Sequence, residues 1–400
     1  MSYPVCQINS ICSLVTSGGT PLTKNLSYYN PPEIPWLKTA EVNYCRIYDT
    51  EKYISKEGLN NSSAKLIPEN SVIVAMYGQG DTAGRVAINK IPLATNQACC
   101  NLVIDEEKAD YQFVYYALST LYDKLVSLKN GGAQPNLNAG IIKSIEIPCP
   151  PIETQHRIAS ILSAYDDLIE NNQKQIKLLE EAAQRLYKEW FVDFHFPGYE
   201  DTPIVDGVPE GWEKCLLSDV ADVNKLNLPK NNEYDSIDYI DLSSVKKGHI
   251  LEKTRYKINE APGRAKRLAI DGDIIWGMVR PNLCSYALVM HPNKRDVFST
   301  GFAVISSKKV PFSYLYSLAT EESFIGYLVN CTNGAAYPAV KPIHFEEAKI
   351  LKPVDEVLNQ FHSIAEPIYR KIEALDKMVI SLAGARDRLM PKLMSGEIEV

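Results

Sequence analysis

Apolar residues recur along residues 153–193 at steps that alternate between four and three positions. This seven-residue repeat is typical of a helix that buries one narrow apolar stripe against another helix. Neither Pro nor Gly interrupts the stretch, and at about 1.5 Å of rise per residue the stripe would be roughly 50 Å long. The stripe consists of Ile158, Leu162, Tyr165, Ile169, Asn172, Ile176, Leu179, Ala183, Leu186 and Trp190.

A second stripe with the same rhythm lies near the C-terminus. Each of its residues follows its counterpart in the first stripe by 203 positions, which indicates an internal duplication of about half the chain. A single stripe of this kind is typical of an ordinary core helix, but two stripes in identical register favour two helices that pack against each other. The second stripe consists of Phe361, Ala365, Ile368, Ile372, Leu375, Val379, Leu382, Arg386, Leu389 and Leu393.

The segments between the helices repeat as well. The apolar run at 71–76 reads as a buried strand and corresponds to 273–278, and the turn at 130–135 corresponds to 333–338. We therefore predict an α+β fold in which two similar α/β domains are joined by two long helices, packed as an antiparallel coiled coil with a pseudo-twofold internal repeat. The predicted segments are 1–150 (first domain), 151–196 (first helix), 197–352 (second domain) and 353–400 (second helix).

Each stripe contains one polar residue at a core position, Asn172 in the first and Arg386 in the second. A buried polar pair fixes the register of a coiled coil, so we predict that Asn172 and Arg386 lie together across the helix pair. The same register places Trp190 opposite Ile368.

Composition and charge exclude only some classes of function. A net charge of −7 argues against the broad basic surface that is typical of nucleic-acid-binding proteins. However, residues 246–267 carry eight Lys or Arg against two Glu, so one region could meet phosphate while another does not. Nine Cys without a C-x-x-C pair indicate a reduced, cytoplasmic protein. We see no signal peptide and no apolar run of membrane length, and we expect no membrane partner.

The sequence lacks the common motifs of catalysis and metal binding. It has no Gly-Lys dipeptide and therefore no Walker loop, and its six His form no ligand pair. Asn-Pro-Pro-Glu at 30–33 resembles the Asn-Pro-Pro-aromatic motif of adenine methyltransferases, but Glu replaces the aromatic residue and no Gly-rich cofactor loop precedes it. We interpret these four residues as a proline turn, and we expect no catalytic residue and no metal site.

Several predicted loops instead combine amide, hydroxyl and basic side chains. Arg reads guanine, and Asn or Gln reads adenine, through paired hydrogen bonds to base edges, while Lys, Ser, Thr and backbone N–H groups hold phosphates. For any one residue an ordinary polar loop is the alternative, but two loop-bearing domains on a rigid spacer favour recognition of nucleic acid. The candidate DNA-binding residues are Ser17, Gly18, Gly19, Thr20, Lys38, Thr39, Gln79, Arg85, Asn96, Gln97, Gln134, Asn136, Arg264, Lys266, Arg267, Arg280, Asn282 and Tyr337.

Over essentially its whole length the chain resembles the specificity (S) subunit of type I restriction-modification systems. The resemblance is carried by the proline-then-helix junctions at 147–158 and 350–360 and by the helix ends at 185–194 and 389–398. Ser-Gly-Gly-Thr-Pro at 17–21, with Ile-Pro-Trp-Leu-Lys-Thr at 34–39, resembles the opening motif of a target recognition domain. The second domain departs from this pattern, because Lys-Leu-Asn at 225–227 stands in place of Gly-Thr-Pro.

The resemblance implies two target recognition domains, each of which reads one half of a bipartite, asymmetric DNA site, with the helices setting the gap between the halves. It implies a non-catalytic subunit whose partners are double-stranded DNA, two methyltransferase subunits and, in systems that also cleave, two restriction subunits. S-adenosylmethionine would be bound by the methyltransferase subunits, which methylate adenine at N6, and ATP with Mg by the restriction subunits. This chain would bind no cofactor itself.

Two other classes of function stay open. One is a stand-alone DNA methyltransferase or nuclease with an unrecognised active site, which binding of S-adenosylmethionine by the purified chain would favour. The other is a coiled-coil scaffold with two protein-binding domains, which failure of an assembled complex to select a DNA sequence would favour.

Overall fold

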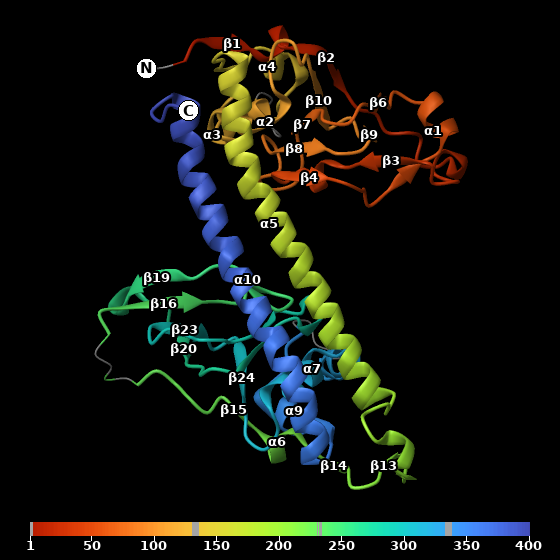
Figure 1. Ribbon diagram of the computed structural model, residues 1–400, viewed down its shortest axis with the longest axis vertical. Helices are drawn as coiled ribbons and strands as arrows, with labels where there is room; N and C mark the ends of the chain where they lie inside the picture. The colour runs from red at the N-terminus through yellow and green to blue at the C-terminus, as the bar shows by residue number, and fades with distance from the viewer. Residues whose placement is uncertain (1–2, 130–135, 230, 232–233, 333–337) are drawn as a thin grey trace. The chain divides into compact units, whose positions relative to one another are not determined.

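The computed structural model describes residues 3–129, 136–229, 231, 234–332 and 338–400. The chain forms two compact units. The first comprises Met1–Glu170 with Ile380–Val400, and the second comprises Asn171–Val379. Each unit holds one predicted α/β domain with part of both long helices (Figure 1), and the predicted boundaries at 150, 196 and 352 stay predictions.

The first unit is built on a five-stranded sheet with the strand order β2-β10-β7-β8-β4 and a four-stranded sheet with the order β5-β3-β9-β6, while β1 pairs with β11. The bounds of its elements are β1 Val5–Gln7, β2 Cys12–Ser17, β3 Ile34–Leu37, β4 Cys45–Ile47, β5 Tyr53–Ile54, α1 Lys56–Asn60, β6 Leu66–Ile67, β7 Val72–Ala75, β8 Val86–Asn89, β9 Leu93–Thr95, β10 Cys99–Ile104, α2 Tyr111–Ser119, α3 Tyr122–Ser127, α4 Ala139–Lys143 and β11 Glu146–Pro148.

Side-chain alternation explains how the layers of the first unit stack. Along β7, Val72 and Val74 join a core with α2, whereas Ile73 and Ala75 join a core with residues of the four-stranded sheet. Because successive strand residues point to opposite faces, the five-stranded sheet is covered on both faces. A strand covered in this way must be apolar throughout, as Val72–Ala75 is.

The second unit has two four-stranded sheets, β15-β24-β21-β22 and β19-β16-β23-β20, with three further two-stranded pairs. The bounds of its elements are β12 Ile204–Val205, β13 Val208–Pro209, β14 Glu213–Leu216, α6 Leu217–Val220, β15 Ala221–Val223, β16 Ser236–Ile240, β17 Val245–Lys246, β18 His249–Ile250, β19 Thr254–Lys257, β20 Ala265–Arg267, β21 Ile274–Gly277, β22 Tyr286–Leu288, β23 Asp296–Ser299, β24 Phe302–Ser307, α7 Phe312–Thr320, α8 Glu322–Asn330, α9 Pro342–Glu346 and β25 Lys349–Lys352.

The two units repeat one topology. β2, β10, β7 and β8 correspond to β15, β24, β21 and β22, which have the same neighbours in the same order. In the second sheet of each unit one pair is parallel, β3 with β9 and β16 with β23. Pairing of β1 with β11 corresponds to pairing of β14 with β25, immediately before a long helix in each case. The predicted mixed fold with an internal repeat is confirmed.

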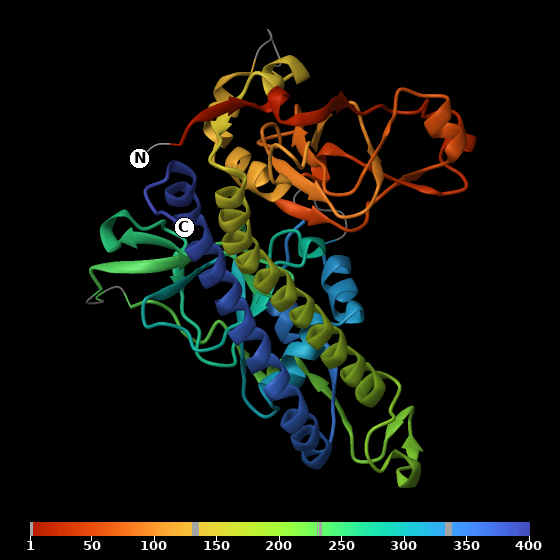
Figure 2. The ribbon, with the colours of Figure 1, turned by 45° about the horizontal axis from the view of Figure 1, so that its top comes forward.

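The two predicted long helices are also confirmed. Helix α5 spans Ile152–Tyr187 and continues as one π-helical turn over Lys188–Val192, and α10 spans Asp355–Ser395. In the first unit the start of α5 and the end of α10 share a core, in which Leu162 and Leu393 are fully or almost fully buried. In the second unit the end of α5 meets the start of α10, where the rings of Trp190 and Phe361 lie 6.0 Å apart. The helices therefore run antiparallel within each unit (Figures 1 and 2).

The predicted register of the helix pair is wrong. The guanidinium of Arg386 donates to Asp166, which lies six residues before Asn172 on α5. Asn172 is buried, and its amide nitrogen has no hydrogen-bond partner in the part of the chain that the structure describes. Trp190 contacts Phe361, seven residues before the expected Ile368. Two stripes with the same period can be matched at any multiple of seven, so the period alone does not choose among registers. Asp166, which pairs with Arg386, lies beside the stripe and not in it.

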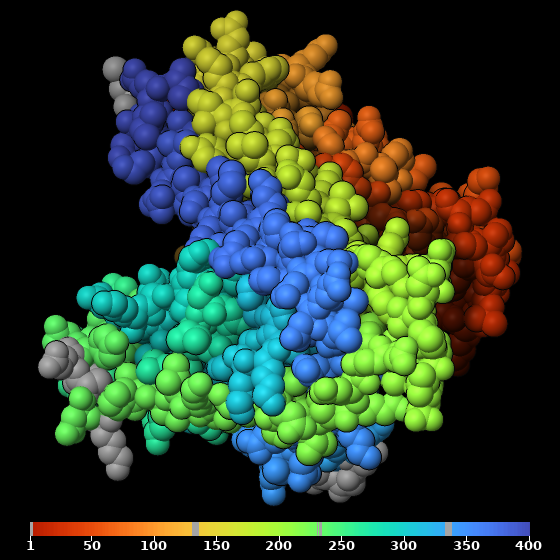
Figure 3. Space-filling view, turned by 60° about the horizontal axis from the view of Figure 1, so that its bottom comes forward, coloured from red at the N-terminus to blue at the C-terminus, as the bar shows by residue number. Residues whose placement is uncertain are grey.

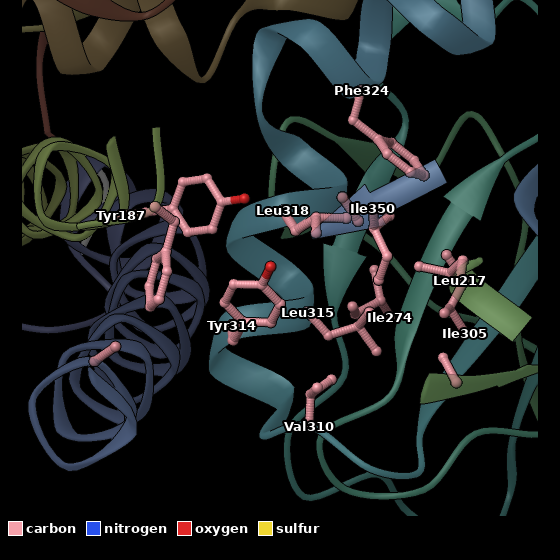
Figure 4. Close-up of a cluster of buried hydrophobic side chains, with 14 of the residues drawn as sticks. Tyr187, Leu217, Ile274, Ile305, Val310, Tyr314, Leu315, Leu318, Phe324 and Ile350 are labelled. Carbon is pink, nitrogen blue, oxygen red and sulfur yellow. The ribbon is translucent and has the colours of Figure 1, made fainter. Parts of the chain in front are cut away.

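The core of the second unit joins its domain to both helices. Figure 4 shows Tyr187 of α5 beside Tyr314 of α7, with the strand residues Ile274 and Ile305 of the same core on the far side of Tyr314 from Tyr187. The rings of Tyr187 and Tyr314 lie 5.9 Å apart. The helix is therefore part of the domain core and not only a connection to it.

None of the helices in the described ranges is long and apolar enough to cross a membrane.

Replacing Phe361 by Ala should strongly destabilise the second unit. Phe361 is fully buried against Trp190, Tyr187 and Phe191, and removal of a buried aromatic ring costs about 3–5 kcal/mol of unfolding free energy. Ile364→Ala is the matched control, because Ile364 is exposed on the same helix and its truncation should cost at most about 0.5 kcal/mol. Urea unfolding followed by circular dichroism measures both, and equal losses would contradict the packing described.

Candidate nucleic-acid interface

Strand register gathers the candidate loops of the first unit at one edge of its five-stranded sheet. Ser17, at the end of β2, pairs with Cys100 at the start of β10, and Cys99 pairs with Ala75 at the end of β7. The β7–β8 loop and the start of β4 follow at the same edge, because Val74 pairs with Val86 and Cys45 with Ala87. Loops 17–20, 76–85 and 95–98 are therefore neighbours although they are far apart in sequence.

Hydrogen bonds tie these loops together. The N–H of Gly19 donates to the carbonyl of Thr95 at 2.8 Å, and the Thr20 hydroxyl donates to Gln97 Oε1. Asn96 Nδ2 donates to Thr39 Oγ1 at 3.2 Å. The structure thus brings together seven predicted residues of the first domain. They are Ser17, Gly18, Gly19, Thr20, Thr39, Asn96 and Gln97.

The two glycines have a steric role in this arrangement. A Cβ on Gly18 would lie 2.2 Å from the carbonyl oxygen of Thr95, and a Cβ on Gly19 would lie 2.2 Å from the backbone nitrogen of Ala64. The indole Nε1 of Trp36 donates to the carbonyl of Gly19 at 3.0 Å. Gly18, Gly19 and Thr39 are buried, so they shape the edge and do not project from it.

The two predicted cations at this edge, Lys38 and Arg85, are neutralised within the unit. Lys38 Nζ lies 3.1 Å from Glu51 Oε2, and Arg85 Nη2 lies 2.6 Å from Asp81 Oδ2. The exposed side chains at this edge include the amides of Gln79 and Gln97. This edge therefore presents mainly neutral hydrogen-bonding groups.

The corresponding edge of the second unit is formed in the same way. Val223 at the end of β15 pairs with Ile305, and Phe302 at the start of β24 pairs with Gly277 at the end of β21. The second sheet adds its own loops at this place, because Ala265 pairs with Ser299. Loops 224–228, 264–267, 278–284 and 300–301 therefore form one surface.

Backbone hydrogen bonds fix the basic loops around residues 300–301. Thr300 N–H donates to the carbonyl of Arg264, and Met278 N–H donates to the carbonyl of Gly301, both at 2.8 Å. Two residues beyond Met278, Arg280 adopts a left-handed conformation with φ of 50°. The loops that carry Arg264 and Arg280 thus flank one turn.

The second edge differs from the first in charge. Arg264, Lys266 and Arg280 are exposed, and within the described residues none of the three forms an ion pair. Arg267 is more enclosed: its Nη1 donates to Asn227 Oδ1 at 2.7 Å, and burial lowers the pKa of its guanidinium. The second edge therefore offers uncompensated positive charge, whereas the predicted cations of the first edge are paired.

The remaining candidates fall into three groups. Asn136 is placed near the first edge, because the next residue, Leu137, donates its N–H to the carbonyl of Met76 at 3.0 Å, and Asn282 is exposed in the β21–β22 loop of the second. Gln134 and Tyr337 lie outside the described residues. Contact of any candidate with DNA stays a prediction.

Sequence reasoning missed two asparagines at these edges. Asn43 accepts from Arg85 Nη1 at 2.8 Å, and Asn224 accepts from Val304 N–H at 3.0 Å. Asn224 has a φ of 58°, a backbone conformation that Asn tolerates better than most residues. Its position after an apolar run was the signal that could have marked it as a turn residue.

In each unit a cation also links the domain to the long helices. In the first unit, Arg46 of β4 pairs with Asp167 and lies 3.6 Å from Glu170, both on α5. In the second, His249 of β18 lies 2.9 Å from Asp376 of α10 and 3.4 Å from Glu180 of α5. The Asp376 and Glu180 carboxylates raise the pKa of His249 to about 10.

Comparison with known protein families gives one domain match. Residues 3–181 match the family model described as type I restriction modification DNA specificity domain. The type I restriction enzyme MjaIX specificity subunit of Methanocaldococcus jannaschii is 29% identical over 400 residues, which cover 96% of this chain and 91% of that protein. The type I restriction enzyme HindI specificity subunit of Haemophilus influenzae is 22% identical, with 94% of this chain and 97% of that protein covered.

A solved structure shares the fold. The crystal structure of the type I restriction-modification system S subunit from M. genitalium matches with a TM-score of 0.64 over 98% of this chain and 96% of that chain. The two sequences are 16% identical, so the likeness concerns the fold and not individual residues.

Replacing Gly19 by Ala should loosen the first edge. The added methyl group would collide with backbone atoms of residues 63–64, so the hydrogen bond from Gly19 to Thr95 should weaken. Amide hydrogen exchange at residues 17–20 and 95–98 should then increase at least tenfold. Gly263→Ala is the control, because a Cβ there meets no atom within 4 Å; equal exchange in both variants would contradict the tight contact.

His249 should make stability depend on pH. Its folded-state pKa of about 10 lies above the ordinary value of 6.5, so the stabilisation is complete below pH 6.5 and is lost as the pH rises through about 10. His249→Gln removes the group that titrates. The difference in urea midpoint between the parent chain and this variant should be largest near pH 6 and should shrink steadily towards pH 10; a difference that grows with pH would contradict the ion pairs.

Proposed function

We propose that this chain, whose residues 3–181 match the type I restriction modification DNA specificity domain and which is 29% identical to a type I specificity subunit over 96% of its length, is the subunit that recognises the DNA sequence and directs its partners to it. Each α/β domain acts as a target recognition domain and reads one half of a bipartite, asymmetric site. The chain supplies sequence recognition, and the partner subunits supply catalysis.

One observation carries this proposal. The two units present corresponding edges of corresponding sheets, built by the same strand order but filled with different loop residues. Two domains that bind different half-sites need the same framework with different loops, because binding residues on loops can vary without disturbing a rigid scaffold. A stand-alone enzyme would have no need of two such edges.

The two edges suit different parts of DNA recognition. Gln79 and Gln97 in the first unit are exposed amides, the side-chain type that reads adenine. Arg280 and Asn282 in the second unit can read guanine and adenine, while Arg264 and Lys266 are placed to hold phosphates. Gly18 and Gly19 hold the first edge in shape.

The partners follow from the same proposal. Two methyltransferase subunits dock on the helical region, and in systems that also cleave two restriction subunits join them. Apolar side chains on the helices remain exposed within each unit, Leu178 and Met378 in the second and Leu168 in the first, and faces of both helices are open to solvent (Figure 3). Docked subunits would cover such residues and, in a chain of net charge −7, would supply much of the phosphate contact.

Cofactor chemistry belongs to these partners. S-adenosylmethionine is bound by the methyltransferase subunits, which transfer its methyl group to adenine N6, and ATP with Mg by the restriction subunits. The described residues contain no group of three or more His, Cys, Asp or Glu that could hold a metal ion.

Selection from random duplex DNA tests the proposal. The chain assembled with its methyltransferase subunits should enrich two short defined sequences separated by a fixed number of undefined base pairs. The methyltransferase subunits without this chain should enrich none. Enrichment of one continuous motif, or the same enrichment without the chain, would refute the proposal.

Neutralising the second edge should reduce the salt dependence of DNA binding. In the assembled complex, Arg264→Ala/Lys266→Ala/Arg280→Ala should flatten the slope of log affinity against log salt by about 0.9 for each phosphate that the variant no longer neutralises. The matched control is Lys214→Ala/Lys309→Ala/Lys349→Ala, which removes the same charge from exposed lysines; Lys309 follows the opposite end of β24. Filter binding between about 50 and 200 mM salt measures both slopes, and equal flattening would show a general charge effect.

A further inference from the structure

A charged triad centred on the buried carboxylate of Asp166 joins the first domain to both long helices. Asp166 of α5 accepts a hydrogen bond from Arg386 of α10 through Oδ1 and from the Tyr116 hydroxyl of α2 through Oδ2, the latter at 2.5 Å. Asp166 and Tyr116 are both buried. Asp387 holds the other side of the guanidinium, accepting from Arg386 Nε at 2.9 Å and from Nη2 at 2.8 Å.

The corresponding place in the second unit is neutral. By the offset of 203, Asp166 corresponds to Tyr369 and Arg386 corresponds to Ala183. There the Tyr369 hydroxyl lies 2.6 Å from Ser317 Oγ, and its ring packs edge-on against Tyr316 with centroids 5.1 Å apart. The duplicated scaffold therefore carries an ion pair with a buried carboxylate at one of its two equivalent positions.

Because the two apolar stripes have the same period, the helices could also pair in a shifted register or with a helix of a second copy. If α10 shifted by one heptad along α5, Val379 or Leu393 would take the place of Arg386 beside Asp166. If α5 paired with α5 of a second copy, Ala183 would take that place. Each alternative buries the Asp166 carboxylate without a cation, which is strongly unfavourable, although the apolar stripes themselves would match.

We propose that Tyr116, Asp166 and Arg386 form a register latch, which selects the pairing of α5 with α10 of the same chain in a single heptad register. A further consequence rests on the proposed function: the latch also fixes the number of unread base pairs between the half-sites. One heptad is roughly 10 Å of helix, the length of about three base pairs of DNA. A slip of register would thus be a discrete change in the gap.

Photo-cross-linking of the full-length chain tests the latch without DNA. A benzophenone amino acid at position 383, which is half-buried beside the stripe, should cross-link to one set of α5 residues. In Asp166→Leu/Arg386→Leu the apolar stripes still match but the latch is absent. Mass spectrometry should then find, at least tenfold enriched, cross-links shifted by seven residues or cross-links between two copies.

Milder variants keep the test decisive if the double variant does not fold. Asp166→Asn keeps the shape and an acceptor for Tyr116 but removes the charge, so shifted cross-links should appear there too. Tyr369→Phe is the matched control, since it removes the neutral contact with Ser317 and should retain the parent pattern. A single unshifted set in Asp166→Asn or in the folded double variant would overturn the latch.

The gap provides a second readout that separates the latch from the proposed function. In the assembled complex, the Asp166→Leu/Arg386→Leu variant should select half-sites of unchanged sequence with added gap lengths that differ by about three base pairs. An unchanged single gap in the variant would overturn the latch while leaving the proposed function intact. If the parent complex selected no DNA sequence, the proposed function would be refuted. The cross-linking pattern alone would then show whether the latch sets the helix register.

Discussion

The burial of two apolar stripes against each other is the constraint on which this structure depends. Neither stripe can be buried alone, and an isolated amphipathic helix gains most of its stability from packing. In the first unit Leu162 and Leu393 share a core, and in the second unit Ile176 and Leu375 share another. Each core also contains residues of the neighbouring sheet and helices, so the sheets that carry the two loop edges are built on the helix pair.

The second constraint is the strand ladder. Once the strand order and pairing are fixed, loops that are distant in sequence must meet at one edge, as loops 17–20 and 95–98 do through Gly19 and Thr95. The same order in both units makes the edges equivalent, while the loop residues make them different. Arg280 stands in the β21–β22 loop, where the β7–β8 loop has Gln79. One scaffold can therefore present a mainly neutral edge and a cationic one.

The spacing of apolar residues and the glycines that mark turns predicted most of the fold. The heptad stripes gave both helices, and the offset of 203 gave the internal repeat, because side-chain period reports directly which face of an element is buried. Gly18 and Gly19 marked a loop that the structure places at the first edge. These features depend on residues that are near one another in sequence.

Long-range electrostatic partners were not predictable in this way. The register was misjudged because Asp166, the partner of Arg386, lies beside the stripe and not in it. Lys38 had the residue type of a phosphate ligand, but Glu51 neutralises it in the folded chain. The ion pairs of Arg46 with Asp167 and of His249 with Asp376 also join residues that are more than 100 positions apart. A single sequence contains no local signal for such pairs.

The most direct test of the account is to map methylated adenines in the DNA of cells that carry this chain with its methyltransferase subunits. The parent chain should give one bipartite motif with a fixed gap. Gln79→Ala should relax only one half of that motif, and Arg280→Ala only the other, because the two residues lie on the edges of different units. Relaxation of the same half by both variants, or a motif that does not depend on this chain, would contradict the claim that one scaffold is used twice to read two half-sites.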